Sequence, residues 1–387
     1  LYMDKIEDFE KPVYDHSLNL DDKTYEQFRS CATCDFVEQA ALMPDAHVGY
    51  VAPVGAVLQT KDYLVPAWVG YDIGCGVTAA KIDVDRVTIE RSANDIYEAV
   101  NDAVPMGQGR YNDYNDISEA GTTTFEHILD EFLRSPHHND IKAFLKRSAI
   151  RHLGSLGSGN HFIEIDYDDD NNAWIVVHSG SRGVGYKVAK RYMERSAGTT
   201  KDYEATHPIH EDSDLGKEYR NILDFGLSFA TENRREMVRT VVESLETVLN
   251  TDISWTTWAN KNHNHALKED DVYVHRKGAT PAKQGERGII PANMRDGSYL
   301  VTGKGSDTFL HSSSHGAGRT MSRTGARDRI DIDDFKAEMR GVVGWVEEQT
   351  LDEAPQAYKD INTVLEAQEK SIHVNKHLQP LINWKGG

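Results

Sequence analysis

Short apolar runs rich in β-branched residues, separated by helical patterns at irregular intervals, constrain the fold of this chain more than any other feature. The runs predict strands, and apolar residues three and four positions apart predict helices, the longest of which contains no proline. We expect strands at 51–58, 77–82, 162–165, 174–177, 272–274 and 299–301, and helices at 93–104, 125–132, 184–197, 223–249 and 335–348. Because the elements do not alternate as a regular βαβ repeat, they predict a mixed α/β (α+β) fold with central β-sheets flanked by helices. No repeat, low-complexity linker or proline-rich hinge divides the sequence, so residues 1–387 are expected to form a single compact domain.

The charge balance limits the kind of nucleic-acid contact that the chain can make. Its 62 acidic and 43 basic residues give a net charge of −19, whereas general affinity for nucleic acid comes from neutralising phosphates with Lys and Arg. Any contact with RNA must therefore be local. The arginines that could make it, Arg182, Arg319 and Arg323, occur in Gly- and Ser-rich segments that we expect to be loops, away from acidic clusters such as 166–170.

The sequence gives no sign of a membrane or a disulfide framework. No apolar run approaches the roughly 18 to 20 residues that a membrane span needs, and the first residues lack the pattern of a signal peptide, so a cytoplasmic protein is expected. The three cysteines are Cys31, Cys34 and Cys75. Cys31 and Cys34 form a C-x-x-C pair, but no second pair follows at zinc-ribbon spacing, and two cysteines one turn apart on a helix is the simpler interpretation.

Two glycine-rich segments early in the chain contain residue types that bind metals. Asp45 and His47 occur in MPDAHVGY, which we expect to be a tight turn before a strand. Asp72 and Cys75 follow in VGYDIGCGV, where the glycines allow a close approach of the backbone. A thiol beside a carboxylate is unusual without a metal ion, although most free cysteines are small buried apolar residues. From this segment alone, both interpretations of Cys75 remain open.

The next motifs place polar side chains at the ends of predicted strands. Asn160, His161 and Glu164 come at the start of a strand in LGSLGSGNHFIEI, and His178 ends the following apolar run before a Ser/Gly loop that carries Arg182. A strand, a glycine-rich loop and a helix start together present backbone amides to an anion. The pattern favours a phosphate site near Arg182, although GSRGVG alone would be weak evidence.

Histidines recur in two later segments. NHNHALKEDDVYVHRKGATPA contributes His263, His265 and His275, of which either of the first two could simply be solvated in a polar loop. HSSSHGAGRTMSR contributes His311 and His315. With the carboxylate, thiol and imidazoles of the earlier motifs, these histidines form a ligand set suited to Mn, Fe, Co or Zn. One shared thiolate could hold two adjacent ions, an arrangement that suits phosphoryl transfer.

Taken in order, these motifs resemble those of the RtcB family of RNA ligases. The resemblance runs from MPDAHVGY through VGYDIGCGV, LGSLGSGNHFIEI, VVHSGSRGVG, RKGATPA, IIPANMRDGSY and SSHGAGRTMSR to DEAPQAYKDI and WKGG, nearly the whole chain. It implies an enzyme, dependent on Mn²⁺ and GTP, that joins an RNA 3′-phosphate or 2′,3′-cyclic phosphate end to a 5′-hydroxyl end. In that family the histidine of HGAGR, here His315, attacks GTP to form a guanylyl-histidine, and the GMP then activates the RNA 3′-phosphate. RNA repair and tRNA splicing are both compatible with this chemistry, and the need for an activating protein partner stays open.

The resemblance also implies roles for individual residues. The ligands of two Mn²⁺ ions are expected to be Asp72, Cys75, His161, His178 and His263. His263 is preferred to His265 because His263 and Asn264 match the family's His-Asn pair. The expected guanylate contacts are Asn160, Phe162, Glu164, Ser298, Ala317, Gly318, Tyr358 and Lys385. The expected RNA contacts are Arg182, Arg319 and Arg323, and Asp45 is expected to support the metal ligands from behind.

The chain departs from the commonest family pattern in one segment. Where many members read Pro-Gly-Ser-Met-Gly, this chain has Pro291, Ala292, Asn293, Met294, Arg295, Asp296 and Gly297, so recognition of the nucleotide could differ in detail. Two other functions are compatible with some of these residues. The same ligands could serve a metal phosphodiesterase or cyclic phosphatase through attack by water, but the presence of His315, Tyr358 and Lys385 favours ligation. A catalytically silent RNA-end-binding protein would be expected to have lost the nucleophile or a metal ligand, and neither is lost.

Overall fold

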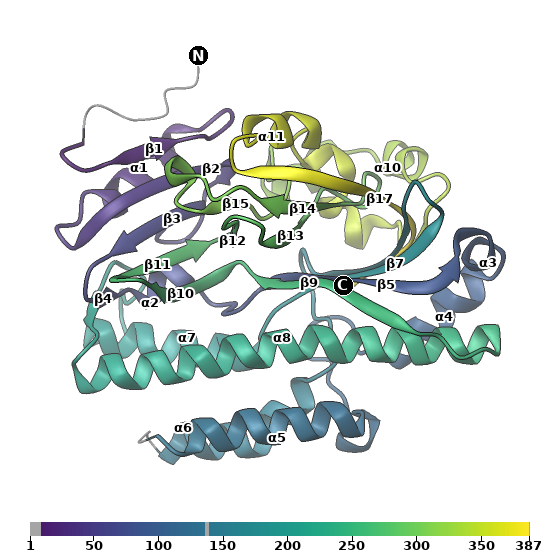
Figure 1. The fold of residues 1–387 in the computed structure, drawn as a ribbon, viewed down its shortest axis with the longest axis horizontal. Coiled ribbons are helices and arrows are strands. Elements are labelled where there is room, and N and C mark those ends of the chain that lie inside the picture. Colours follow the sequence, from purple (N-terminus) through teal and green to yellow (C-terminus); the bar gives the residue numbers. More distant parts are fainter. Residues whose placement is uncertain (1–8, 136–138, 387) are drawn as a thin grey trace.

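Two β-sheets form the centre of the structure, a computed structural model that describes residues 9–135 and 139–386 (Figure 1). The smaller sheet has the strand order β1-β2-β3-β11-β10, and the larger has the order β13-β14-β17-β6-β7-β5-β9, with β16 added against β17. The strands of the smaller sheet are β1 (Val13–Asp15), β2 (Val37–His47), β3 (Val54–Thr60), β10 (Asn264–Glu269) and β11 (Val272–Lys277). Those of the larger sheet are β5 (Gly76–Asp85), β6 (Phe162–Tyr167), β7 (Asn172–Ser179), β9 (Trp255–Asn262), β13 (Arg287–Pro291), β14 (Ser298–Gly303), β16 (Val343–Gly344) and β17 (Ile372–Lys385). Two short pairs, β4 (Tyr63–Leu64) with β8 (Ile209–His210) and β12 (Ala279–Pro281) with β15 (Ser312–Ser314), complete the strands of the described residues.

The chain passes directly from the larger sheet to the smaller one at His263. Strand β9 ends at Asn262 in the larger sheet, and β10 begins at Asn264 in the smaller one. The larger sheet also curls until its two edge strands, β13 and β9, come into contact. Ile289 of β13 and Ala259 of β9 accordingly share one buried cluster with Phe162, Trp174 and other inward side chains. The inner face of this curled sheet therefore forms a packed apolar core, to which β6 contributes Phe162 and β17 contributes Leu378.

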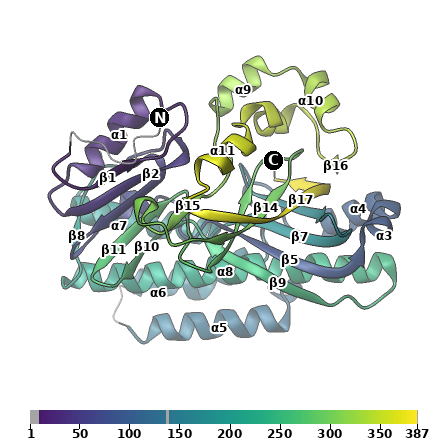
Figure 2. The same cartoon turned by 45° about the horizontal axis from the view of Figure 1, so that its top comes forward.

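The longest helix, α8 (Asp214–Leu249), spans 36 residues beneath both sheets. The Ser213 side chain accepts a hydrogen bond from the backbone N–H of Gly216 at its start, and Asn250 ends it in the left-handed conformation. Met237, Val238 and Val241 on one side of α8 pack under the larger sheet. On the opposite side, α5 (Glu119–Leu133) packs against it, so that α8 lies between the sheets and α5 in both views (Figures 1 and 2).

The remaining helices are short and surround this core. They are α1 (Asp22–Ala32), α2 (Pro66–Val69), α3 (Arg86–Arg91), α4 (Ala93–Ala103), α6 (Asn139–Phe144), α7 (Arg182–Ala197), α9 (Arg323–Arg329), α10 (Ile332–Glu338) and α11 (Ile361–Ala367). Single turns occur at η1 (Tyr114–Asp116), η2 (Leu145–Ala149), η3 (Ile150–His152), η4 (Asp307–Phe309), η5 (Glu348–Glu353) and η6 (Pro355–Ala357). None of the described helices, α8 included, combines the length and the apolar character that crossing a membrane requires.

The mixed α/β fold class is confirmed, and several local predictions need correction. The helix predicted at 335–348 ends at Glu338, because Gly341 adopts a left-handed φ of 95° and the chain then enters β16. The strand predicted at 51–58 begins only at Val54. The segment of Asp45 and His47 is the end of β2 and not a turn.

Three further expectations concerned loops and helices. His265 lies buried in β10, and not in a polar loop, because β10 pairs with β11 within the smaller sheet. Cys34 follows α1, which ends at Ala32, so the two cysteines do not share the helix. Arg182 and Arg323 open helices α7 and α9 instead of lying in loops.

Candidate functional site

Four neighbouring strands of the larger sheet bring five polar residues to one edge. Cys75 directly precedes β5, His161 directly precedes β6, His178 is the penultimate residue of β7, and His263 directly follows β9. Since β5 runs antiparallel to both β7 and β9, its start lies beside their ends, and the same holds for the start of β6 beside the end of β7. Strand pairing thus gathers residues from four separate motifs, and Asp72 joins them from the loop before Cys75.

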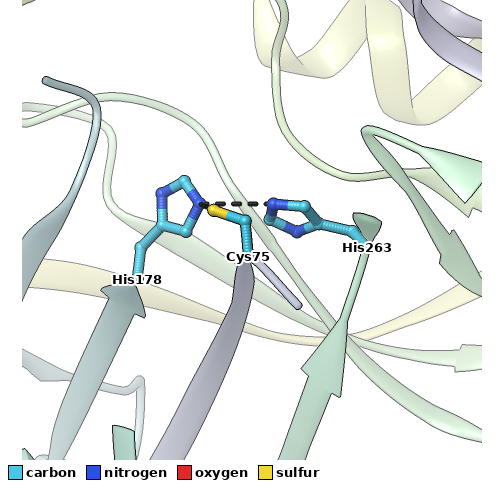
Figure 3. A group of neighbouring side chains, drawn as sticks. All are labelled: Cys75, His178 and His263. Atoms are coloured by element: carbon cyan, nitrogen blue, oxygen red, sulfur yellow. Dashed lines mark hydrogen bonds between the residues drawn. The ribbon is translucent and has the colours of Figure 1, made fainter. Parts of the chain in front are cut away.

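The side chains of Cys75, His178 and His263 point toward one another (Figure 3). The Sγ of Cys75 lies 3.3 Å from Nε2 of His178 and 3.4 Å from Nε2 of His161. Nε2 of His178 lies 3.4 Å from Nε2 of His263, and an oxygen of Asp72 lies 2.9 Å from Nε2 of His161. Two triads result, Cys75 with His178 and His263 and Cys75 with Asp72 and His161, and the ligand atoms within each lie within 4.8 Å of one another.

The donor atoms of this group fit metal ions. Nδ1 of His161 and Nδ1 of His178 each donate to a backbone carbonyl at 3.0 Å, which leaves Nε2 of each ring to face the cluster. Burial lowers the pKa of His178 and His263 far below the usual value, so these imidazoles are neutral and offer lone pairs. Atoms that bind one ion at about 2.0 to 2.3 Å lie about 3.0 to 3.7 Å apart. The contacts of Cys75 with His178 and His161, and of His178 with His263, are 3.3 to 3.4 Å and fall within this range. Burial and the adjacent Asp72 carboxylate raise the pKa of the Cys75 thiol, so a thiolate at this position needs nearby cations.

A buried arginine that the sequence analysis missed ties the strand ends together. Arg234 of α8 is fully buried, and its Nη1 donates to the carbonyls of Gly74 and Ser179, each at 2.9 Å. Its Nε and Nη2 donate to the side-chain oxygens of Asn260 and Asn262 at 2.7 and 2.6 Å. The guanidinium thereby fixes the ends of β7 and β9 and the residue before Cys75. Its signal in the sequence was a charged residue within an otherwise apolar helical face, which could equally have been exposed.

His315 stands beside this cluster with its orientation fixed by Asp45. His315 follows β15, and its Nδ1 lies 2.6 Å from an oxygen of Asp45 that also accepts from the backbone N–H groups of His315 and Gly316. Burial alone would raise the pKa of Asp45, but the contact with His315 outweighs it and the pKa is lowered. The His315 ring packs against His263, with ring centroids 4.8 Å apart. Asp45 thus lies behind His315, and its predicted support of the metal ligands stays a prediction.

A cavity of about 580 Å³ opens in front of His315. Among the residues predicted to contact nucleotide or RNA, those that line it are Asn160, Phe162, Glu164, Ala317, Gly318, Arg319, Arg323, Tyr358 and Lys385. Two predicted residues do not: Ser298 is buried in β14, and Arg182 lies instead beside His161, with its Nη1 3.1 Å from Nδ1 of that ring. Ala292, Asn293 and Met294, from the segment that departs from the family pattern, also form part of the wall.

Two buried carboxylates give the cavity its charge pattern. Glu164 accepts from the Asn383 side chain at 2.7 Å through one oxygen, while the other oxygen has no hydrogen-bond partner. Burial raises the pKa of Glu164 to about 8, against the opposing effects of Asn383 and Lys385. Asp166, two residues further along β6, is buried as well, and burial together with Glu164 raises its pKa. The acidic cluster at 166–170 is therefore not remote from the site, because strand alternation turns Asp166 to the same face as Glu164.

The second carboxylate, Glu353, was not predicted and binds most of the cationic groups of the cavity. One oxygen of Glu353 accepts from Lys385 Nζ and the Tyr358 hydroxyl, both at 2.7 Å, and the other accepts from Arg323 at 2.6 Å and Arg319 at 3.4 Å. A phosphate that binds these arginines must therefore compete with an acidic residue already in place. Glu353 occurs in the motif DEAPQAYKDI, but nothing in the sequence places it near Lys385.

Comparison with known proteins gives one consistent result. The family described as "tRNA-splicing ligase RtcB" matches residues 27–386. The RNA-splicing ligase RtcB of Escherichia coli K12 is 32% identical over 381 residues, which cover 93% of each chain. The tRNA-splicing ligases RtcB of Thermococcus kodakarensis and Methanococcus maripaludis are 28% and 26% identical, and each alignment covers 89% of this chain and 87% of the relative.

Proposed function

The chain belongs to the RtcB family of tRNA-splicing ligases, and from this we propose that it joins RNA ends through a guanylyl group carried on His315. The proposed substrates are GTP, an RNA end with a 3′-phosphate or 2′,3′-cyclic phosphate, and an RNA end with a 5′-hydroxyl. The observation that supports it most directly is the position of His315, which is held by Asp45 between the metal-binding cluster and the cavity.

The residues around His315 suit nucleophilic attack. Because Nδ1 faces the Asp45 carboxylate, the imidazole carries its proton there and presents an unprotonated Nε2 to the cavity. In the proposed reaction, Nε2 bonds to the α-phosphorus of GTP and pyrophosphate leaves. A 2′,3′-cyclic phosphate is first opened by water to a 3′-phosphate and a free 2′-hydroxyl. An oxygen of the RNA 3′-phosphate then takes the guanylyl group from His315. The 5′-hydroxyl attacks the activated phosphate, loses its proton and releases GMP.

Two manganese ions are proposed for the cluster, held by Asp72, Cys75 and His161 and by Cys75, His178 and His263. When bound, such ions would supply positive charge to phosphate oxygens during the displacement. The chain itself orients the ligand side chains, because backbone carbonyls fix the imidazoles of His161 and His178 and Arg234 fixes the strand ends.

The proposed guanine site is the end of the cavity at Glu164. Guanine presents two adjacent N–H donors on its Watson–Crick edge, and a carboxylate offers two acceptor oxygens to match them. Glu164 still has one unpartnered oxygen, Phe162 offers a ring face, and Lys385 lies 5.4 Å from the centre of that ring. Adenine presents an acceptor at the same position, which an ionised Glu164 would repel.

The function is tested by incubating the protein with α-labelled GTP and Mn²⁺, followed by a denaturing gel and treatment of the band with acid and alkali. If the label is a phosphoramidate of His315, acid should remove it and alkali should not. RNA with a 3′-phosphate should also remove the label from the protein. A protein that binds Mn²⁺ but takes no label from GTP would refute the ligase mechanism and favour a metal phosphodiesterase.

Guanine binding should depend on pH because Glu164 must be ionised to accept from the base. Its pKa, raised to about 8, leaves it mostly protonated at pH 7. The affinity for GMP should therefore rise about tenfold per pH unit up to that pKa and then level off. Calorimetric titration with GMP between about pH 6 and pH 8.5 measures this. Glu164→Gln should bind GMP weakly with no such slope, and an equal slope in both proteins would show that another group titrates.

A further inference from the structure

Three tyrosines, the outer two of them exposed, form a ladder beside the metal-binding cluster. Tyr71 stacks on Tyr186, with ring centroids 5.0 Å apart and planes inclined by 24°, and Tyr50 meets the edge of Tyr71 at 5.9 Å. Tyr50 is 72% exposed and Tyr186 50% exposed, unlike most aromatic residues of the chain. Large rings gathered in contact with water commonly mark a binding surface. We call Tyr50, Tyr71 and Tyr186 the tyrosine ladder.

Each of the three tyrosines of the ladder is close to the site, in the sequence or in space. Tyr71 precedes Asp72 of the metal-binding cluster, and Tyr50 lines the cavity in front of His315. Tyr186 lies one helical turn after Arg182, whose guanidinium lies beside His161. A ligand on the ladder would therefore extend the substrate in the cavity and would not form a separate complex.

The ladder is held in place although it is exposed. The Tyr71 hydroxyl donates to Glu204 and lies 3.3 Å from the Tyr203 hydroxyl. The Gln27 side chain donates to the carbonyls of Gly49 and Tyr50 at 2.8 and 2.7 Å and accepts from the backbone N–H of Gly49 at 3.0 Å. A rigid aromatic surface loses little conformational entropy when a flat ligand stacks on it.

We propose that the tyrosine ladder stacks the unpaired bases of RNA next to the end that is joined. This rests on the proposed function, because it assumes that an RNA end occupies the cavity. A chain with a net charge of −19 has little general attraction for phosphates, whereas stacking on aromatic rings binds single strands of any sequence. Arg182 and the exposed Lys187 on the same helix provide local cations for the backbone between such bases.

The test measures RNA binding and GTP labelling separately in Tyr186→Ala. Fluorescence anisotropy with a single-stranded RNA that ends in a 3′-phosphate, and with one that begins with a 5′-hydroxyl, gives the affinity for each end. We expect a loss of about 5- to 100-fold for the end that reaches the ladder. GTP labelling should be unchanged, because Tyr186 does not line the cavity. Tyr186→Phe should retain the affinity, and Tyr114→Ala, which removes a similarly exposed ring in η1, should bind as the wild type does.

Abasic RNAs identify the stacked strand and provide the outcomes that overturn the proposal. Removing the terminal bases of the bound strand should weaken binding to the wild type and abolish the difference between wild type and Tyr186→Ala. Normal RNA affinity in Tyr186→Ala refutes the proposal. Full RNA affinity in Tyr186→Leu also refutes it, because leucine is apolar but has no aromatic ring on which a base can stack. Absence of GTP labelling in the wild type refutes the proposed function alone, since these binding measurements do not require ligation.

Discussion

Replacing His315 with alanine is expected to abolish covalent labelling by GTP. The imidazole is the proposed attacking group, and no other histidine of the described residues combines a place in the cavity with an Asp45-like carboxylate behind it. The measurement is the labelled band on a denaturing gel at saturating Mn²⁺. His311→Ala is a matched control from the same segment, since the His311 side chain is 40% exposed and pairs only with the exposed Asp307; it should label as the wild type does. A band of normal intensity in His315→Ala would place the guanylyl group on another residue.

Asp45→Asn tests the orientation of His315 and not its presence. Asparagine can fill the same space, but it can donate to Nδ1, so the ring proton would move to the nitrogen that must attack. Loss of the equivalent carboxylate behind the histidine of serine proteases costs about 10⁴-fold, and we expect labelling to slow by about 10³- to 10⁴-fold. Mn²⁺ binding should be unchanged, because Asp45 contacts His315. A parallel loss of Mn²⁺ would instead show that Asp45 supports the metal ligands.

Replacing Cys75 with alanine is expected to remove both metal ions together. Its Sγ belongs to both ligand triads, so one substitution leaves only Asp72 and His161 on one side and His178 and His263 on the other. Loss of a group that merely orients a ligand costs about 10- to 100-fold in metal affinity, and loss of a shared thiolate should exceed about 100-fold. Equilibrium dialysis with Mn²⁺ gives both the stoichiometry and the affinity.

Cys34→Ala is the matched control for Cys75→Ala, because Cys34 lies outside the site and is not fully buried. It should bind as many ions as the wild type. Retention of two ions in Cys75→Ala would show that the two triads do not share the thiol. Loss of one ion would assign Cys75 to one site only.

Site residues were predictable where their residue type alone indicates metal binding or catalysis. They were not predictable where their role depends on which strands pair. Cys75 and His178 stood out because a thiol and an imidazole occurred beside glycines. The structure brings His263 to them, whereas His265 lies buried in β10 away from the cluster. Arg234 and Glu353 could not be found, since their importance comes from what packs against them. The segment of Asp45 was predicted as a turn because of Pro44, while pairing with β3 extends β2 to His47.

The fold was predictable in class and in its stronger elements. The predicted strands at 77–82 and 174–177 lie within β5 and β7. In β7 the apolar residues 173–177 are continuous because both faces are buried, whereas β5 also contains the exposed Lys81. The strands β9 and β17 were missed because polar residues interrupt the alternation of apolar and polar residues by which a strand is recognised. The start of α8 was missed by nine residues because Leu215, Tyr219 and Ile222 are widely spaced among polar residues there.

The place of β17 in the larger sheet has a consequence for synthesis of the protein. It lies between β14 and β6, although hundreds of residues separate it from β5 and β6 in the chain. A nascent chain that stopped before Ile372 would lack β17, and with it both Lys385 in the wall of the cavity and the strand that covers the edges of β14 and β6. Such edges invite association with other chains. Incomplete translation products should therefore be recognised and degraded as misfolded proteins, and should not persist as ligases with relaxed control over the RNA ends they join.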